Sequence, residues 1–259
     1  MKRALALFLS ISLVTVAVRA DEKTPDTAKP GEMTDPLEIV KKVDAATKAV
    51  TSVKYNVVWE GLEAAAATTP KVEATVIASG LVNATPEKYL IDAKITFPNT
   101  SESVKVTAGT DNDMFFVIHH HTKMAYEDID PAVMGNVGRF FQRALMIEYI
   151  HPTPFTDEIN GRSRELRGSK TIDGEDCYEI HVVYAVEQAP QATWYFSKKD
   201  FLPRGRIDTF VRGEQRQVWQ KWVSGLVPNP KLNDDVFKLK LPEGYTKTDD
   251  FAPDITPPR

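Results

Sequence analysis

The fold is decided by residues 53–60, which read VKYNVVWE. Apolar side chains at the odd-numbered positions alternate with mostly polar ones, and this period of two is typical of a strand with one buried face. The segment before it has a helical period. Asp35 is a candidate N-cap, Pro36 suits the first helical position, and apolar residues then recur at helical spacing up to Val50. The sequence therefore predicts an amphipathic helix that leads directly into a strand.

The period of two returns along most of the chain. Six such segments precede residue 130 with no helical segment between them, so they must pair as an antiparallel meander. Five more follow residue 160, and Asp173-Gly174 is a strong hairpin signal between two of them. The predicted strands are 53–60, 72–78, 88–97, 104–108, 114–118, 124–129, 166–172, 175–184, 192–197, 204–212 and 215–226.

A second helix is predicted over 131–145, with an aromatic face that includes Phe140 and Phe141. Gly135 and Gly138 lie inside it, and each costs about 1 kcal/mol relative to alanine in a helix interior. About eleven strands are too many for a flat sheet around two helices. We therefore predict an α+β fold in which a strongly curved antiparallel sheet of about eleven strands forms a half-open β-barrel, with two main helices covering the opening.

The two ends of the chain differ from the part between them. Residues 4–18 form an uncharged apolar run behind a short basic head, too short to span a bilayer and followed by small residues that suit cleavage after Ala20. Both the stretch after this site and the last residues are polar and contain several prolines. The predicted organisation is a signal peptide at 1–20, a flexible leader at 21–34, one domain at 35–248 and a disordered tail at 249–259.

Composition narrows the function. Apolar residues make up 42% of the chain and charged residues 26%, which is ordinary globular usage. With 32 basic against 36 acidic residues the net charge is −4, which argues against a dedicated nucleic-acid binder. The single cysteine, Cys177, excludes an internal disulfide and a cysteine-rich zinc module.

The candidates for catalysis or metal binding are weak. The run His119-His120-His121 could share a metal, but a polar hairpin turn is the favoured interpretation because no acidic or cysteine ligand stands at suitable spacing. Residues 111–113, DND, lack the glycine and the terminal glutamate of a calcium loop. Cys177 is four residues from the nearest histidine on its strand, about 13 Å away by strand rise, so an inert thiol is expected. We predict no enzyme activity and no cofactor.

The aromatic inventory is the feature that points to a function. Any one of these side chains could be ordinary core, but a curled sheet of this many strands has more concave surface than two short helices can fill, and the surplus would be an apolar cavity. The predicted cavity residues are Tyr55, Val57, Trp59, Tyr89, Ile91, Ile95, Phe116, Phe140, Phe141, Tyr178, Ile180, Trp194, Phe196 and Trp222.

Several segments in this order resemble the periplasmic outer-membrane lipoprotein-carrier superfamily (LolA/LolB-like). The likeness spans about 35–246, but the chain is longer than a typical carrier around 63–70 and 151–157, and none of its arginines is matched to the one that locks the carriers' lid. The segments are DPL at 35–37 leading into VKYNVVW at 53–59, GSKTIDGEDCYEI at 168–180, WYF at 194–196 with LP at 202–203, LNDDVF at 232–237 and LPEG at 241–244.

This resemblance implies an eleven-stranded half-barrel and a soluble, non-catalytic periplasmic protein, exported across the inner membrane, that binds or transfers acyl chains of lipids or lipoproteins. A membrane-bound donor or acceptor protein would be a further partner, and the chain is expected to be a monomer. The alternative is an envelope-stress sensor or regulatory module that uses the same groove to bind lipoproteins or a protein partner. Such regulators resemble two-domain proteins, whereas this chain has room for one domain. A hydrolase is the third and weakest alternative.

Overall fold

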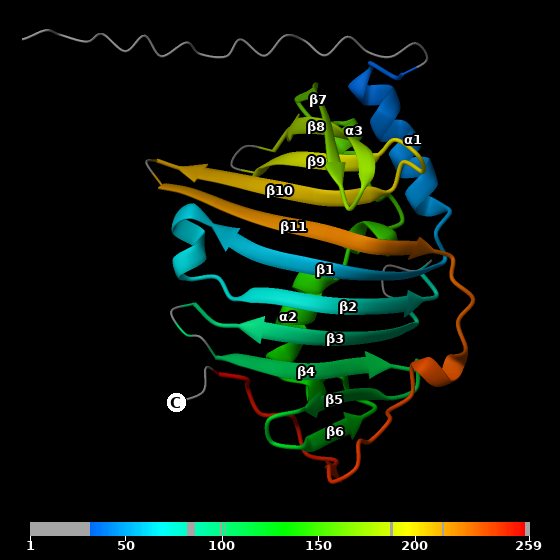
Figure 1. Ribbon diagram of the computed structural model, residues 1–259, viewed down its shortest axis with the longest axis vertical. Helices are drawn as coiled ribbons and strands as arrows, with labels where there is room; N and C mark the ends of the chain where they lie inside the picture. Colours follow the sequence, from blue (N-terminus) through cyan, green and yellow to red (C-terminus); the bar gives the residue numbers. More distant parts are fainter. Residues whose placement is uncertain are drawn as a thin grey trace, which may run out of the picture.

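The computed structural model describes residues 32–81, 86–98, 100, 102–186, 189–213 and 215–256. The predicted signal peptide and nearly all of the predicted leader lie outside these residues. Within them, one sheet of twelve strands runs in the order β12-β6-β5-β4-β3-β2-β1-β11-β10-β9-β8-β7 (Figure 1). Every neighbouring pair is antiparallel except β12 and β6, and β12 and β7 form the two edges, so the sheet is not closed. The predicted half-open sheet is confirmed.

All eleven predicted strands are present, with ends that shift by a few residues. A twelfth, β12, adds a short parallel edge to β6 through the register Thr246↔Met124. The strands are β1 (Ser52–Leu62), β2 (Lys71–Ser79), β3 (Lys88–Thr96), β4 (Ser103–Thr110), β5 (Phe115–His119), β6 (Met124–Asp128), β7 (Ser163–Ile172), β8 (Glu175–Val183), β9 (Gln191–Ser197), β10 (Pro203–Arg212), β11 (Gln215–Pro228) and β12 (Thr246–Thr248).

Helices cover one face of the sheet, called the inner face below. α2 lies across β1, β2 and β3, while α1 lies beside the β7–β9 end (Figure 1). α1 starts as predicted, because Asp35 Oδ1 accepts a hydrogen bond from the Leu37 amide at 2.8 Å. The α-helices are α1 (Pro36–Lys48), α2 (Val137–Ala144) and α3 (Thr156–Ile159), and the 3₁₀ helices are η1 (Glu63–Ala67), η2 (Pro131–Met134), η3 (Ile147–Tyr149) and η4 (Asp234–Val236).

The predicted second helix is interrupted. Gly135 has φ of +51° and ends η2, and α2 begins two residues later, at Val137. A side chain at position 135 would also be blocked, since a Cβ there would lie 2.7 Å from the carbonyl oxygen of Ala252. The prediction of one continuous helix over 131–145 is therefore wrong. Gly138, in contrast, is an ordinary α2 residue with nothing within 4 Å of a Cβ.

The two glycines give a paired stability prediction. Gly138→Ala should raise the free energy of unfolding by about 0.5–1 kcal/mol, because alanine is the better helix former and fits without contact. Gly135→Ala should lower it by about 1–3 kcal/mol, because alanine strains at this φ and meets the Ala252 carbonyl. Urea unfolding of both variants checks this, and changes of equal sign would contradict the assignment of a helix break at Gly135.

The C-terminal segment wraps around the β6 edge. On the outer face Leu239 and Tyr245 cover the small cluster of Phe116, Ile118 and Ala125. After β12 the chain returns to the inner side, where the Ala252 amide donates to the Val133 carbonyl at 3.0 Å and where Ala252 and Ile255 are buried. The prediction of a disordered tail is therefore wrong for 249–256. Composition suggested fraying because prolines flank the few apolar residues that anchor this segment.

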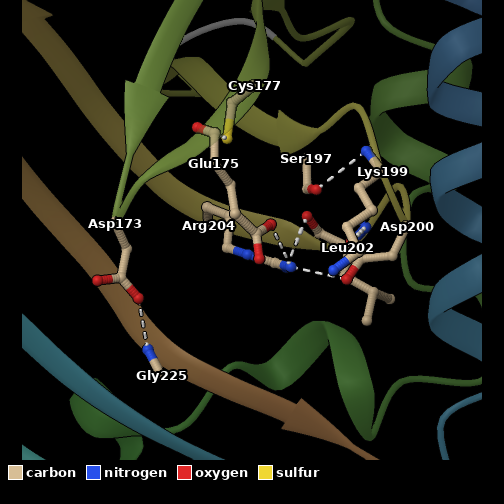
Figure 2. Close-up of polar contacts among 9 residues, drawn as sticks. All are labelled: Asp173, Glu175, Cys177, Ser197, Lys199, Asp200, Leu202, Arg204 and Gly225. Atoms are coloured by element: carbon tan, nitrogen blue, oxygen red, sulfur yellow. Dashed lines mark hydrogen bonds and ion pairs between the residues drawn. The ribbon is translucent and has the colours of Figure 1, made fainter.

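The β7–β8 hairpin is attached at two places (Figure 2). At its tip, Asp173 Oδ2 accepts a hydrogen bond of 2.7 Å from the Gly225 amide of β11. At the start of β8, Glu175 forms an ion pair with Arg204 at 2.8 Å, and Asp200 pairs with the same guanidinium at 2.7 Å. These contacts fix the β8–β9–β10 end of the sheet, on whose inner face several of the predicted cavity residues lie.

Candidate functional site

An apolar cavity of about 800 Å³ lies between α2 and the sheet. Below, it is called the α2 cavity. Its wall combines β3, β4 and β5 with η2, α2 and the chain after α2. The lining residues are Pro86, Glu87, Tyr89, Thr110, Asn112, Phe115, Pro131, Met134, Gly138, Phe141, Gln142, Arg143, Leu145, Ile147 and Ile150.

The structure brings twelve of the fourteen predicted cavity residues to the inner face. Tyr89 and Phe141 line the α2 cavity, and Trp59 and Trp194 line a smaller pocket beside it. The other eight belong to the packed core, with Phe140 at its edge. These eight are Tyr55, Val57, Ile91, Ile95, Phe140, Tyr178, Ile180 and Phe196.

Two predicted residues lie on the wrong side of the sheet. Phe116 packs into the outer cluster beneath the C-terminal segment, and its neighbour Phe115 faces the cavity instead. Trp222 also points outward, where its ring lies 5.0 Å from Tyr195 and under the ammonium group of Lys170. Neighbouring residues of a strand point to opposite faces, so each of these two predictions chose a residue of the outer face. A strand with apolar residues on both faces does not show which face is the inner one.

The chain after α2 supplies cavity residues that the sequence interpretation missed. Leu145, Ile147 and Ile150 line the cavity, although none of them is among the predicted cavity residues. This stretch is tied to β1, because the Tyr55 hydroxyl donates to the Ala144 carbonyl at 3.2 Å and accepts from the Met146 amide at 2.9 Å. The position of Tyr55 at the centre of a predicted strand gave no indication of this role.

A second pocket of about 210 Å³ adjoins the α2 cavity, and half of its lining residues carry charged side chains. We call it the charged pocket. Arg206 is its central residue: Nε forms an ion pair with Asp208 at 2.6 Å, and a terminal nitrogen reaches Glu148 at 3.5 Å. Its guanidinium carbon lies 4.6 Å from the Trp194 ring centre. The lining residues are Trp59, Gln142, Arg143, Met146, Ile147, Glu148, Trp194, Arg206, Asp208 and Lys221.

Two cations in the charged pocket have no carboxylate partner within the described residues. Lys221 Nζ donates to the Leu145 carbonyl at 2.7 Å, and burial lowers the pKa of Lys221. Arg143 makes no salt bridge in this part of the chain and stacks its guanidinium 4.4 Å from the centre of the Trp59 ring. Glu148 is 7% exposed and its Oε2 has no hydrogen-bond partner among these residues.

The histidine run is only partly a turn. His119 is the last residue of β5, is buried and packs against Tyr126 at 5.3 Å between ring centres, so its placement in the turn was wrong. His120 starts the turn and contacts Thr107 Oγ1 at 2.8 Å and the Tyr245 hydroxyl at 3.1 Å. No group of three potential metal ligands is found in the described ranges.

Cys177 is buried on the outer side of β8. Its sulfur lies 3.6 Å from the Glu175 carbonyl oxygen, and burial raises the pKa of the thiol to about 11. A nucleophilic cysteine needs the thiolate form near neutral pH. This environment therefore favours the thiol form, the opposite of what such a nucleophile requires.

Comparisons with known proteins give matches by structure. No family model matches the chain, and no curated protein matches its sequence. LprF from Mycobacterium bovis is similar over 83% of this chain and 100% of its own, with a TM-score of 0.51 and 14% identity. MucB covers 80% of this chain with a TM-score of 0.47 and 8% identity, and this chain spans 63% of the length of MucB. A LolA superfamily protein from Nitrosomonas europaea covers 80% of this chain and 99% of its own, with a TM-score of 0.33 and 13% identity.

At these sequence identities the similarity is one of fold only. The alignment with LprF, which covers the whole of that protein, supports it. The chain shares its fold with LprF over the full length of that protein. The fold implied by the sequence resemblance is thereby confirmed. Among the described residues, no helix combines the length and apolar character needed to cross a bilayer.

Proposed function

We propose that this chain binds an acyl chain of a lipid or lipoprotein in the α2 cavity, which is called the acyl cavity from here on. The cavity itself carries the proposal, because about 800 Å³ falls within the range of small-molecule sites, roughly 300–1,000 Å³. Its wall is predominantly apolar, with Tyr89, Phe115 and Phe141 on facing sides. Burying one methylene contributes about 0.8 kcal/mol, so a 16-carbon chain would gross roughly 13 kcal/mol before the costs of binding.

The proposed function is that of a periplasmic binding or transfer protein without catalytic activity. The sequence of residues 1–20 supports export, and the carrier fold supports an acyl ligand. Transfer would require a membrane-bound donor or acceptor as a second partner. α2 would act as the lid over the ligand, since it forms the wall of the cavity opposite the sheet.

Position 138 gives a test that separates filling the cavity from unfolding the protein. Gly138 lines the acyl cavity with no atom within 4 Å of a Cβ, so Gly138→Phe can place a ring there without a backbone clash. We expect this variant to bind a fluorescent 16-carbon fatty acid at least about tenfold more weakly. Gly138→Ala is the matched control, because it also removes the glycine from the helix but adds only one methyl group, and it should bind as the wild type does.

Hydrogen exchange provides the second readout. When palmitate is added to the wild-type protein, amides of α2 should become more protected, while amides of β8 on the far side of the core stay unchanged. Unaltered probe affinity in Gly138→Phe, together with unchanged α2 exchange, would show that the ligand does not enter the acyl cavity and would overturn the proposal.

A further inference from the structure

The charged pocket has more positive than negative side chains. Arg143, Arg206 and Lys221 face two carboxylates, Glu148 and Asp208, which leaves one positive charge in excess. Arg206 pairs with both carboxylates. The cations without an ion pair inside the described ranges are therefore Arg143 and Lys221. A partly buried pocket with surplus positive charge favours an anion.

The two cavities meet at a shared wall. Gln142, Arg143 and Ile147 line both the acyl cavity and the charged pocket. Arg143 therefore lies where apolar lining gives way to charged lining. A molecule that occupies both volumes must have an apolar chain on one side of Arg143 and a polar group on the other.

We propose that the charged pocket binds the anionic head of an acyl ligand, a carboxylate or a phosphate, with Arg143 as its principal contact and Lys221 as the second cation. This inference rests on the proposed acyl-binding function. A guanidinium matches the paired oxygens of either anion, and such charge-assisted hydrogen bonds are the strong ones. Arg206 pairs with both Glu148 and Asp208, and the pocket as a whole keeps one positive charge in excess.

Two sources could supply this head: a free fatty acid, or a phospholipid whose phosphate carries the charge. The source is distinguished by comparing palmitate with 1-palmitoyl lysophosphatidate. Monopalmitoylglycerol is the neutral ligand with the same acyl chain.

The test is isothermal titration of the mature protein with these three ligands. Wild-type protein should bind at least one of the two anions at least about tenfold more tightly than monopalmitoylglycerol. Arg143 is exposed, and Arg143→Met, which keeps the length of the side chain, should weaken binding of the preferred anion at least about tenfold more than binding of monopalmitoylglycerol, so that the preference is lost. Arg143→Lys should retain part of the preference.

Arg139→Met is the matched control. Arg139 lies one turn earlier on α2, is exposed and lines neither cavity, so its removal changes the net charge equally without touching the site. If Arg143→Met and Arg139→Met lost the preference for the anions equally, the preference would come from long-range charge, and the proposed head-group site would be overturned. Equal affinities of the wild type for all three ligands would also overturn it while leaving acyl binding in place. Failure of all three to bind would overturn both proposals.

Discussion

Replacing Phe155 by alanine should lower the free energy of unfolding by about 3–5 kcal/mol, the usual cost of deleting a buried aromatic ring. Phe155 precedes α3 and is fully buried. Its ring packs edge-on against Trp194 at 5.3 Å and Phe196 at 5.4 Å between ring centres, so it joins the α3 segment to β9. A domain of this kind has about 5–15 kcal/mol in total, and this single change removes a large share of it.

Urea unfolding monitored by circular dichroism measures the effect. Phe251→Ala is the control, since Phe251 is 57% exposed and its loss should change stability by no more than about 0.5 kcal/mol. Phe155→Leu should recover part of the loss because leucine refills some of the space. A loss below 1 kcal/mol for Phe155→Ala would mean that the α3 segment is not packed on β9 as described.

The strands were predictable because most of them bury one face. In β1 and β3 the apolar residues stand at alternate positions, and the structure places that face inward. β5 is different, since Phe115 and Val117 face the core while Phe116 and Ile118 lie under the C-terminal segment. A strand buried on both faces has no alternation to read.

The charged pocket could not be predicted from the pattern of β10. There Arg206 and Asp208 point to the inner face, and Ile207 between them takes the outer one. A strand that places its charged residues inward breaks the rule that apolar residues line a core, and such exceptions are expected at functional sites. In the register of β9 and β10, Arg206 pairs with Trp194, and this pairing brings the guanidinium onto the ring. The register follows from the assembled sheet and not from the sequence of either strand.

Replacing Arg204 by methionine should lower the free energy of unfolding by about 2–3 kcal/mol. The Arg204 side chain is 3% exposed, pairs with Glu175 and Asp200, and donates to the Leu202 carbonyl at 3.3 Å (Figure 2). Breaking a fully buried pair costs about 3–5 kcal/mol because a charge is left without compensation. Here Glu175 and Asp200 are 33% and 30% exposed, so water can partly replace the guanidinium and the loss is smaller.

Chemical denaturation of Arg204→Met beside Arg216→Met separates a buried clamp from loss of charge alone. Arg216 pairs with Glu63 at 2.9 Å, but both side chains are more than half exposed, so its replacement should cost no more than about 0.5 kcal/mol. Arg204→Lys should fall between wild type and Arg204→Met, because an ammonium group cannot serve two carboxylates and a carbonyl with the guanidinium's fixed geometry. If Arg204→Met were no more destabilising than Arg216→Met, the β7–β8 hairpin would be held by its backbone ladder and the Asp173 contact, and the Arg204 cluster would be a surface ion pair in energetic terms.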